Sequence, residues 1–128
     1  MLIYRQSTGL LTGPDGKSMG IGYSGSGAGK NDPTAQDSPG IGPIPRGLWS
    51  IGAPYDSART GPFTLPLYKL DDAVPGDDTD QDNGRSAFRI HGDSLMAPGT
   101  ASHGCIILPR IVRNQIVAMG AKQLQVIA

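Results

Sequence analysis

Glutamate is absent from this sequence, and all 11 of its acidic residues are aspartates. Aspartate is a poor helix former and a good residue for loops and helix caps, so this composition argues against a helical bundle. Aromatic residues make up only 5% of the chain, and its single tryptophan, Trp49, is expected in the core. Glycine (19 residues) and proline (11 residues) are abundant instead, which predicts short strands joined by many turns.

An excess of charge of either sign is also absent, because 11 lysine and arginine residues balance the aspartates. Balanced charge gives no indication of binding to nucleic acid or to anionic lipid. No apolar run is long enough to span a bilayer, and residues 1–9 lack the charged and apolar regions of a Sec-type signal. We therefore expect a protein that is made in the cytoplasm without a Sec signal, with no membrane span and no nucleic-acid partner.

The length of 128 residues predicts one domain, 1–128, with one modest core. Short apolar stretches bounded by turn residues predict about seven or eight strands. These are expected at 2–6, 10–12, 19–23, 48–51, 63–70, 88–90, 105–108 and 124–127. Pro66 makes its stretch an edge strand or a bulged one, and Gly20 and Gly22 leave one strand face bare for close approach of a backbone or ligand. The fold class predicted is a mainly β, sandwich-like or barrel-like domain.

One helix is predicted near the C-terminus. Pro109 suits its first turn, and Gly120 suits its end. Arg110 and Arg113 fall away from its apolar face. That face is formed by three residues with helical spacing, Val112, Ile116 and Met119.

Two long segments have neither a strand nor a helix pattern. Residues 24–42 are rich in glycine and serine, which predicts either a mobile surface loop or a loop that faces a substrate. Residues 71–83 hold six of the 11 aspartates. The spacing of Asp78, Asp80 and Asp82 resembles a calcium loop, but the glycine comes one position late and no glutamate follows. A solvated acidic loop is therefore the better interpretation.

Both histidines and the only cysteine of the chain lie within residues 88–110. The pattern there predicts a strand ending near His91, a polar loop containing His103, and a second strand beginning near Cys105. One cysteine cannot form an internal disulfide. A thiol with an imidazole within reach is the minimal arrangement for a cysteine nucleophile, because the imidazole can take the thiol proton.

The two histidines are unequal candidates for the base. His91 can face the sulfur squarely from a neighbouring strand, whereas His103 is only two residues from Cys105, which is sterically awkward. Gly104 permits an unusual backbone conformation, and the N–H groups of Gly104 and Cys105 are candidates for binding an oxyanion. The residues alone leave two alternatives open. One is a metal site with the two histidines and the cysteine as ligands, and the other is a structural cysteine.

The motif SHGC at 102–105, preceded by HG at 91–92, resembles the signature of L,D-transpeptidases of the YkuD-like fold. More narrowly, the whole chain resembles a family of type VI secretion effectors that carry a divergent L,D-transpeptidase domain. The other matching pieces occur in the right order along the chain: YSG at 23–25, KN at 30–31, GPIPRG at 42–47, RI at 89–90 and IIL at 106–108.

This resemblance implies a YkuD-like catalytic domain that acts on the tetrapeptide stems of peptidoglycan. Cys105 would attack the carbonyl between the third residue and the terminal D-alanine, with His91 as the base and His103 as a wall of the site. The acyl group then passes to water, which shortens the stem, or to a D-amino acid, which exchanges its last residue. No cofactor or metal is implied. The other residues expected at the substrate or oxyanion are Gly92, Ser102, Gly104, Tyr23 and Arg110.

The resemblance also implies a toxin that acts in the periplasm of a rival bacterium. Its partners would then include the secretion apparatus and a cognate immunity protein. A catalytically inactive peptidoglycan-binding module, a phage-encoded wall enzyme and a fragment of a larger protein are the alternatives. One departure from the family pattern concerns Ile106 and Ile107, which stand where many members carry arginine or asparagine. Arg110 or Arg113 would then bind the substrate carboxylate, unless both are solvated helix residues.

Overall fold

The computed structural model describes residues 1–128 and shows a mainly β protein with 32% strand and 12% helix. One α-helix, α1 (Arg110–Ala118), lies near the C-terminus, and two 3₁₀ helices, η1 (Gly27–Gly29) and η2 (Pro33–Ala35), lie in the expected loop segment. The fold class predicted from the sequence is confirmed. The ten strands are β1 (Leu2–Arg5), β2 (Leu10–Thr12), β3 (Ser18–Ile21), β4 (Tyr23–Ser24), β5 (Gly47–Ile51), β6 (Tyr55–Ser57), β7 (Gly61–Lys69), β8 (Arg89–His91), β9 (Ile106–Ile107) and β10 (Gln123–Ile127).

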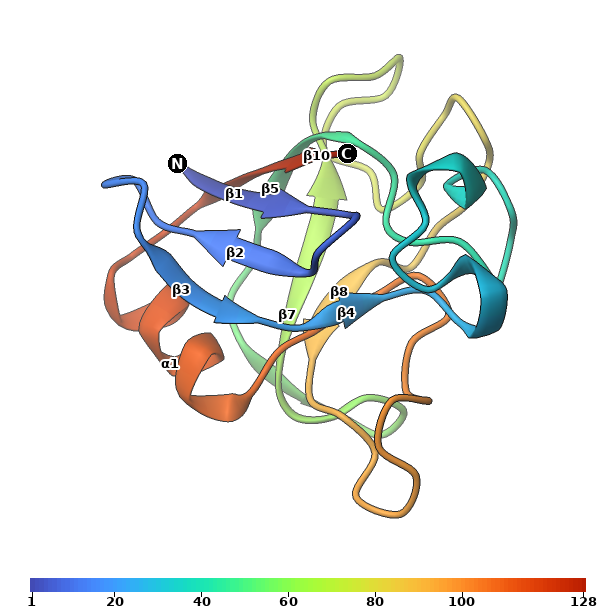
Figure 1. Ribbon diagram of the computed structural model, residues 1–128. Coiled ribbons are helices and arrows are strands. Elements are labelled where there is room, and N and C mark those ends of the chain that lie inside the picture. The colour runs from blue at the N-terminus through green and yellow to red at the C-terminus, as the bar shows by residue number, and fades with distance from the viewer.

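Nine of the strands form a continuous path that begins and ends on the same stretch of chain. The order is β3-β2-β1-β10-β5-β7-β8-β9-β4, and β6 pairs with β7 beside this path. Because β3 and β4 are consecutive parts of residues 18–24, the path closes on itself into a barrel-like sheet (Figure 1). The pairs β1–β10 and β8–β9 are parallel.

Gly22 lies between β3 and β4, where the sheet closes. Its N–H donates to the Gly9 carbonyl (2.8 Å), and a Cβ at this position would lie 1.7 Å from the Ile107 carbonyl oxygen. A Cβ at Gly20 would lie 2.7 Å from the side chain of Val112 on α1. The bare strand face predicted from these glycines is therefore occupied by a backbone at one position and by the helix at the other.

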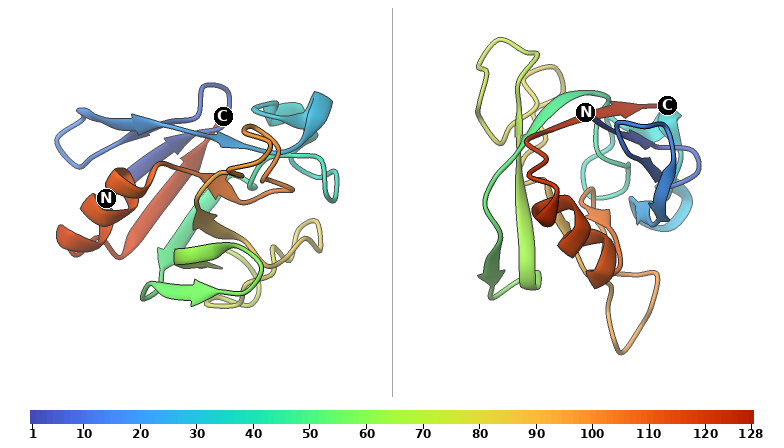
Figure 2. Two further views of the ribbon diagram at one scale, coloured as in Figure 1. Left: turned by 90° about the horizontal axis from the view of Figure 1, so that it is seen from below. Right: turned by 90° about the vertical axis from the view of Figure 1, so that its left-hand side faces the viewer.

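The core is one cluster of 16 buried apolar side chains. Trp49 is fully buried as expected, with its ring in edge-to-face contact with Phe88 at 5.1 Å between centroids. Its indole N–H donates to the Pro45 carbonyl (3.1 Å), so the polar end of the ring is satisfied. The right-hand view of Figure 2 shows α1 between the β5–β7 side and the β3–β4 side of the sheet, where it covers the core.

Helix α1 follows the sequence prediction in part. Val112 and Ile116 are buried, but Met119 is 46% exposed because the helix ends at the preceding residue. Pro109 is the N-cap residue and so precedes the first turn. Arg113 is buried, although it was expected away from the apolar face, because its guanidinium donates to three backbone carbonyls. No helix in the structure has the length and apolar character that a membrane span requires.

Strand β7 lies inside the sheet, so the expectation of an edge strand around Pro66 was wrong. The strand pairs with β5, β6 and β8. Pro66 is tolerated because it faces the gap between β5 and β6, where its carbonyl accepts the Gly52 N–H (2.9 Å) and no partner needs its missing N–H. The alternative expectation, a bulge in this strand, is not met at Pro66, which pairs in register with Arg89; the register shift of β7 lies at its other end, against β6.

The acidic segment 71–83 is anchored to the core by one of its aspartates. Asp80 is buried, and its carboxylate lies 3.0 Å from the ammonium of Lys69, which in turn lies 5.6 Å from the ring centroid of Trp49. The prediction of a solvated loop is therefore wrong for Asp80, because a buried lysine on β7 needs a counter-ion. Figures 1 and 2 show this segment at the end of the molecule opposite the loop 92–105.

Candidate active site

The connection between β8 and β9 positions His91 and Cys105. His91 is the last residue of β8, and Cys105 immediately precedes β9. The two strands pair in parallel, with Ile90 opposite Ile106 and His91 opposite Ile107. Parallel neighbours require a crossover connection. The loop 92–105 is this connection, and it returns the chain from the end of β8 to the beginning of β9.

His91 and Cys105 project from the same face of the sheet. Ile90 and Ile106 are fully buried and point into the core. Because side chains alternate along a strand, their neighbours point to the other face. Cys105 lies two residues before the position opposite His91 on the neighbouring strand, so the Cα atoms of the two residues are about 8 Å apart.

The side chains of His91, Cys105 and His103 line one cleft of about 940 Å³, the thiol cleft. Pro39 and Gly40 also line it, so the end of segment 24–42 faces the cleft. This supports the substrate-facing alternative for that segment over the mobile one. The other walls come from residues 58–61, 84–89, 91–94, 100–101 and 103–105.

His91 is buried and held in one orientation. Its Nδ1 lies 2.9 Å from the Gly92 carbonyl oxygen. A carbonyl can only accept, so Nδ1 carries the proton and Nε2 of the neutral ring is the free base. Burial lowers the pKa of His91 below its ordinary value, and the charges of Arg113 and Arg89 add to this effect, whereas the Gly92 carbonyl and Asp93 oppose it. The imidazole is therefore neutral at neutral pH and able to accept a proton.

The Cys105 thiol is half-buried and protonated at neutral pH. Burial raises its pKa above the ordinary value, against the opposing effects of the Arg89 backbone N–H and the charges of Arg89 and Arg85. Sγ donates to the Ala87 carbonyl at 3.7 Å. Ala87 has a φ of 64°, a left-handed conformation that is unfavourable for alanine and typical of strained functional sites. Attack by this sulfur therefore requires a base.

His103 occupies a different environment from His91. It is exposed on the wall of the cleft, with Nδ1 3.3 Å from the Gly40 carbonyl oxygen. Neither imidazole forms a hydrogen bond with Sγ of Cys105 in the structure. The structure contains no group of three histidine, cysteine or aspartate side chains arranged to hold a metal ion. His91 is thus the histidine with the buried, oriented ring.

Ser102 holds in place residues 102–105, the thiol loop. It does not line the cleft, although it was expected at the substrate. It is 1% exposed, and its Oγ accepts from the N–H groups of Gly25 (2.9 Å) and Gly104 (3.1 Å) while donating to the Cys105 carbonyl (2.6 Å). The Gly104 N–H is therefore engaged, which corrects its expected role as an oxyanion donor. The Cys105 N–H has no hydrogen-bond partner within the protein and is the donor that remains.

Gly104 is required by its conformation and by its close neighbours. Its φ is 145°, and a Cβ there would lie 2.5 Å from Nη2 of Arg85 and 3.0 Å from the Phe88 ring. Arg85 is buried and donates to the carbonyls of Gly42 (2.9 Å) and His103 (3.1 Å). It thereby ties segment 24–42 to the thiol loop. Sequence reasoning missed Arg85, because an arginine directly after an acidic segment carries no signal of burial.

Tyr23 fastens the loop 92–105 to strand β4. Its hydroxyl donates to Asp93 at 2.5 Å and accepts from the Ala101 N–H at 3.0 Å. Burial, followed by Asp93, raises the pKa of Tyr23 to about 12, so the hydroxyl stays protonated as a donor. Tyr23 lines an adjoining side pocket, not the thiol cleft.

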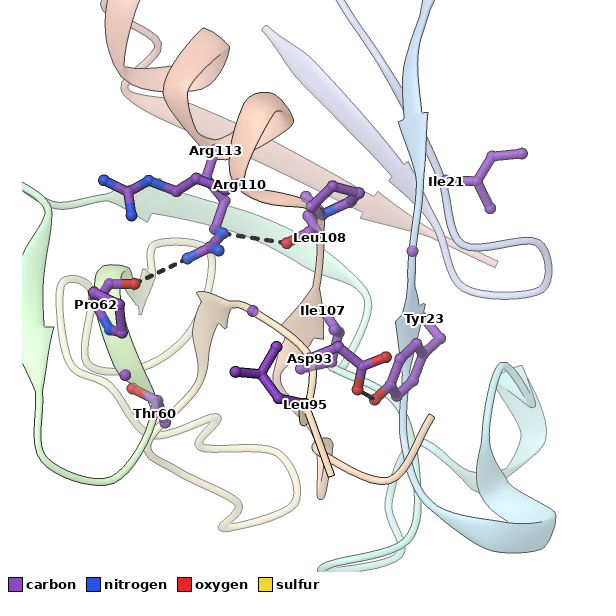
Figure 3. Close-up of a pocket in the computed structure, with 14 residues that line it drawn as sticks. Ile21, Tyr23, Thr60, Pro62, Asp93, Leu95, Ile107, Leu108, Arg110 and Arg113 are labelled. Atoms are coloured by element: carbon purple, nitrogen blue, oxygen red, sulfur yellow. Dashed lines mark hydrogen bonds between the residues drawn. The ribbon is translucent and has the colours of Figure 1, made fainter. Parts of the chain in front are cut away.

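The side pocket, which Figure 3 shows, has a volume of about 530 Å³. It shares residues 60–61 and 92–93 with the thiol cleft. Arg110 lines this pocket, and its guanidinium carbon lies 4.4 Å from the centroid of the Phe63 ring. Of the expected substrate residues, Gly92 borders both spaces, Gly104 lines only the thiol cleft, and Tyr23 and Arg110 line only the side pocket. Ile107 also lines the side pocket, which explains the apolar residue found after the cysteine.

Positive charge gathers around these two spaces although the chain is neutral. Asp93 is the only one of the 11 aspartates among the lining residues, whereas five of the 11 basic residues lie there. Such an imbalance favours an anionic ligand. The basic residues concerned are Arg59, Arg85, Arg89, Arg110 and Arg113.

A closed β sheet with a cysteine and an oriented histidine in one cleft defines a candidate acyl-transfer enzyme. A family model described as the Tlde1 domain matches residues 18–127. The chain therefore belongs to this family of type VI effectors with L,D-transpeptidase-like activity, as its motifs indicated. No curated protein and no solved structure gives a significant match.

The titration of His91 leads to a pH-dependent prediction. Because the pKa of His91 is lowered below 6.5, the neutral base persists into mildly acidic solution. We expect kcat/KM to be constant from pH 7.5 down to about 6.5 and to fall tenfold per unit below the lowered pKa. Arg89→Gln removes a charge that lowers this pKa and should move the fall to higher pH, whereas Arg5→Gln, far from the cleft, should not. A wild-type midpoint above pH 7 would contradict the assignment.

Proposed function

We propose that this protein is an antibacterial cysteine enzyme that acts on the tetrapeptide stems of peptidoglycan. It removes the terminal D-alanine as an L,D-carboxypeptidase, exchanges it for another D-amino acid, or does both. The observation that carries the proposal is the placement of Cys105 and the free Nε2 of His91 in one cleft. Family membership supports the substrate class.

In the proposed reaction, Sγ of Cys105 attacks the carbonyl between the third residue of the stem and D-alanine. The thiol proton passes to Nε2 of His91, and the Cys105 N–H stabilises the oxyanion. Collapse of this intermediate breaks the C–N bond, and His91 returns the proton to the leaving amine of D-alanine. A thioester remains on Cys105.

In the second half of the reaction, water or the amine of a D-amino acid attacks the thioester. His91 takes a proton from the attacking group and returns it to the sulfur as the C–S bond breaks. Water yields a tripeptide stem, and the amine yields a stem with a new terminal residue. Both outcomes remove tetrapeptide donors from cross-linking, which would make the protein toxic to a target cell.

The arginine-rich lining of the cleft supports a substrate with several carboxylates, such as a peptidoglycan stem. In this proposal residues 1–128 act as one catalytic domain in the periplasm of the target bacterium. The secretion apparatus that delivers the protein and a cognate immunity protein in the producing cell are its protein partners.

Mass spectrometry of tetrapeptide muropeptides incubated with the purified protein tests the proposal. We expect loss of terminal D-alanine in buffer and its replacement when another D-amino acid is added in excess. Unchanged muropeptides under both conditions would contradict the proposal. Binding of muropeptides without any product would instead support an inactive wall-binding module.

A further inference from the structure

Arg113 has a guanidinium group in which the protein satisfies only two of the three nitrogens. The side chain is 6% exposed. Its Nε donates to the Leu108 carbonyl (3.2 Å), and Nη1 donates to the carbonyls of Pro62 (3.0 Å) and Phe63 (2.9 Å). A guanidinium has five N–H donors, so these three contacts leave both N–H groups of Nη2 without an acceptor in the protein.

The unsatisfied nitrogen of Arg113, Nη2, lies at the side pocket. Figure 3 shows the guanidinium held between Pro62 and Leu108 at the wall of this pocket. A Cβ at Gly92 would lie 2.8 Å from Nη2, so a larger residue would cover the nitrogen. The glycine that follows His91 in the HG motif therefore leaves Nη2 open.

No carboxylate of the protein balances the charge of Arg113. The only ion pairs in the structure are those of Lys69. Asp93 also lines the pocket, but its carboxylate already accepts from a tyrosine hydroxyl and from two backbone N–H groups. Arg110 adds a second positive charge to the same wall. A buried cation without a counter-ion is unfavourable, so an anionic ligand would complete this site.

The position of Nη2 relates the side pocket to the reacting bond. The pocket and the thiol cleft share Gly92, and the carbonyl of this glycine orients the imidazole of His91. A group bound at Nη2 therefore lies close to Gly92 and so beside the base. A charge-assisted hydrogen bond from Nη2 suits a carboxylate oxygen as its acceptor.

We propose that Arg113 is a specificity-determining residue whose Nη2 binds the free α-carboxylate of the amino acid on the leaving side of the scissile bond. This assignment rests on the proposed function. It restricts the enzyme to the last residue of a stem, because a bond followed by further chain offers no carboxylate at that place. In the exchange reaction, the incoming D-amino acid binds its carboxylate to the same nitrogen.

The test compares a tetrapeptide stem that ends in a free D-alanine carboxylate with the same stem ending in D-alanine amide. We expect the wild-type protein to turn over the acid with a kcat/KM about ten- to a hundredfold above that of the amide, the effect of one hydrogen bond to a charged group. Arg113→Gln should abolish this preference. Arg110→Gln should retain it, and Arg5→Gln controls for loss of a surface charge.

Equal turnover of acid and amide by the wild type would overturn the assignment and leave the proposed function standing. No turnover of either substrate would overturn both. A preference lost in Arg110→Gln but kept in a folded Arg113→Gln, as judged by thermal melting, would assign the carboxylate to Arg110 instead. Because Arg113 donates to three backbone carbonyls, Arg113→Gln can fail to fold, and Arg110→Gln then decides. A preference retained in Arg110→Gln keeps the carboxylate at Arg113, and a preference lost in it moves the carboxylate to Arg110.

Discussion

Replacing Cys105 with alanine is expected to reduce turnover of tetrapeptide stems by about 10⁴-fold or more. The thiol lines the same cleft as a neutral, oriented imidazole, and no other cysteine exists in the chain to replace it. Initial rates of D-alanine release, measured for both proteins at equal concentration, test this expectation.

The fold should survive the substitution, because Cys105 is only half-buried and its thiol donates only a weak hydrogen bond, to the Ala87 carbonyl. Thermal melting of wild type and variant provides this control. Cys105→Ser, which keeps the size and the proton donor, should also lose most activity because the hydroxyl is a weaker nucleophile at this site. A Cys105→Ala variant with more than about a tenth of wild-type activity would exclude the cysteine mechanism.

Replacing His91 with glutamine should lower kcat/KM by about 10² to 10⁴-fold, the usual loss when a general base is removed. The pKa of the Cys105 thiol is raised, so the sulfur is not ionised in advance and depends on a proton acceptor. The amide of glutamine cannot accept that proton at neutral pH. Steady-state kinetics on the tetrapeptide substrate provide the measurement.

His103→Gln is the matched comparison, because it removes the other imidazole from the same cleft. His103 is exposed and its imidazole is hydrogen-bonded only to the Gly40 carbonyl, so its loss should change kcat/KM less than about threefold. The opposite order of effects, with His103→Gln the more severe, would reverse the roles assigned to the two histidines.

The strands and the helix could be predicted because each has a local signal in the sequence. Alternating apolar residues marked most of the strands, and the spacing of Val112 and Ile116 marked the helix. Strand β6 was not predicted, because its residues Tyr55–Ser57 are mostly polar and exposed. Its pairing depends on β7, which lies beside it only after the chain has folded. Pro66 likewise misled the prediction, because the gap opposite it is a property of the assembled sheet.

The reacting residues of the site could be predicted from the sequence, whereas the residues that hold them in place could not. Cys105 and His91 stood out because the chain has so few residues of their kinds. Ser102 belongs to the same motif, yet its role in holding the thiol loop depends on the Gly25 backbone, which is distant in sequence. Arg85 and Arg113 are buried by carbonyls from other segments, so neither has a local pattern that separates it from a solvated arginine.

Rapid acid quenching followed by intact-protein mass spectrometry tests the central claim most directly. The wild-type protein, mixed with excess tetrapeptide stem and quenched during turnover, should carry one added acyl group equal to the stem without its terminal D-alanine. Peptide mapping should place that group on Cys105, and the Cys105→Ala variant should carry none. An adduct on a different residue, or product formed at the wild-type rate by Cys105→Ala, would contradict the account.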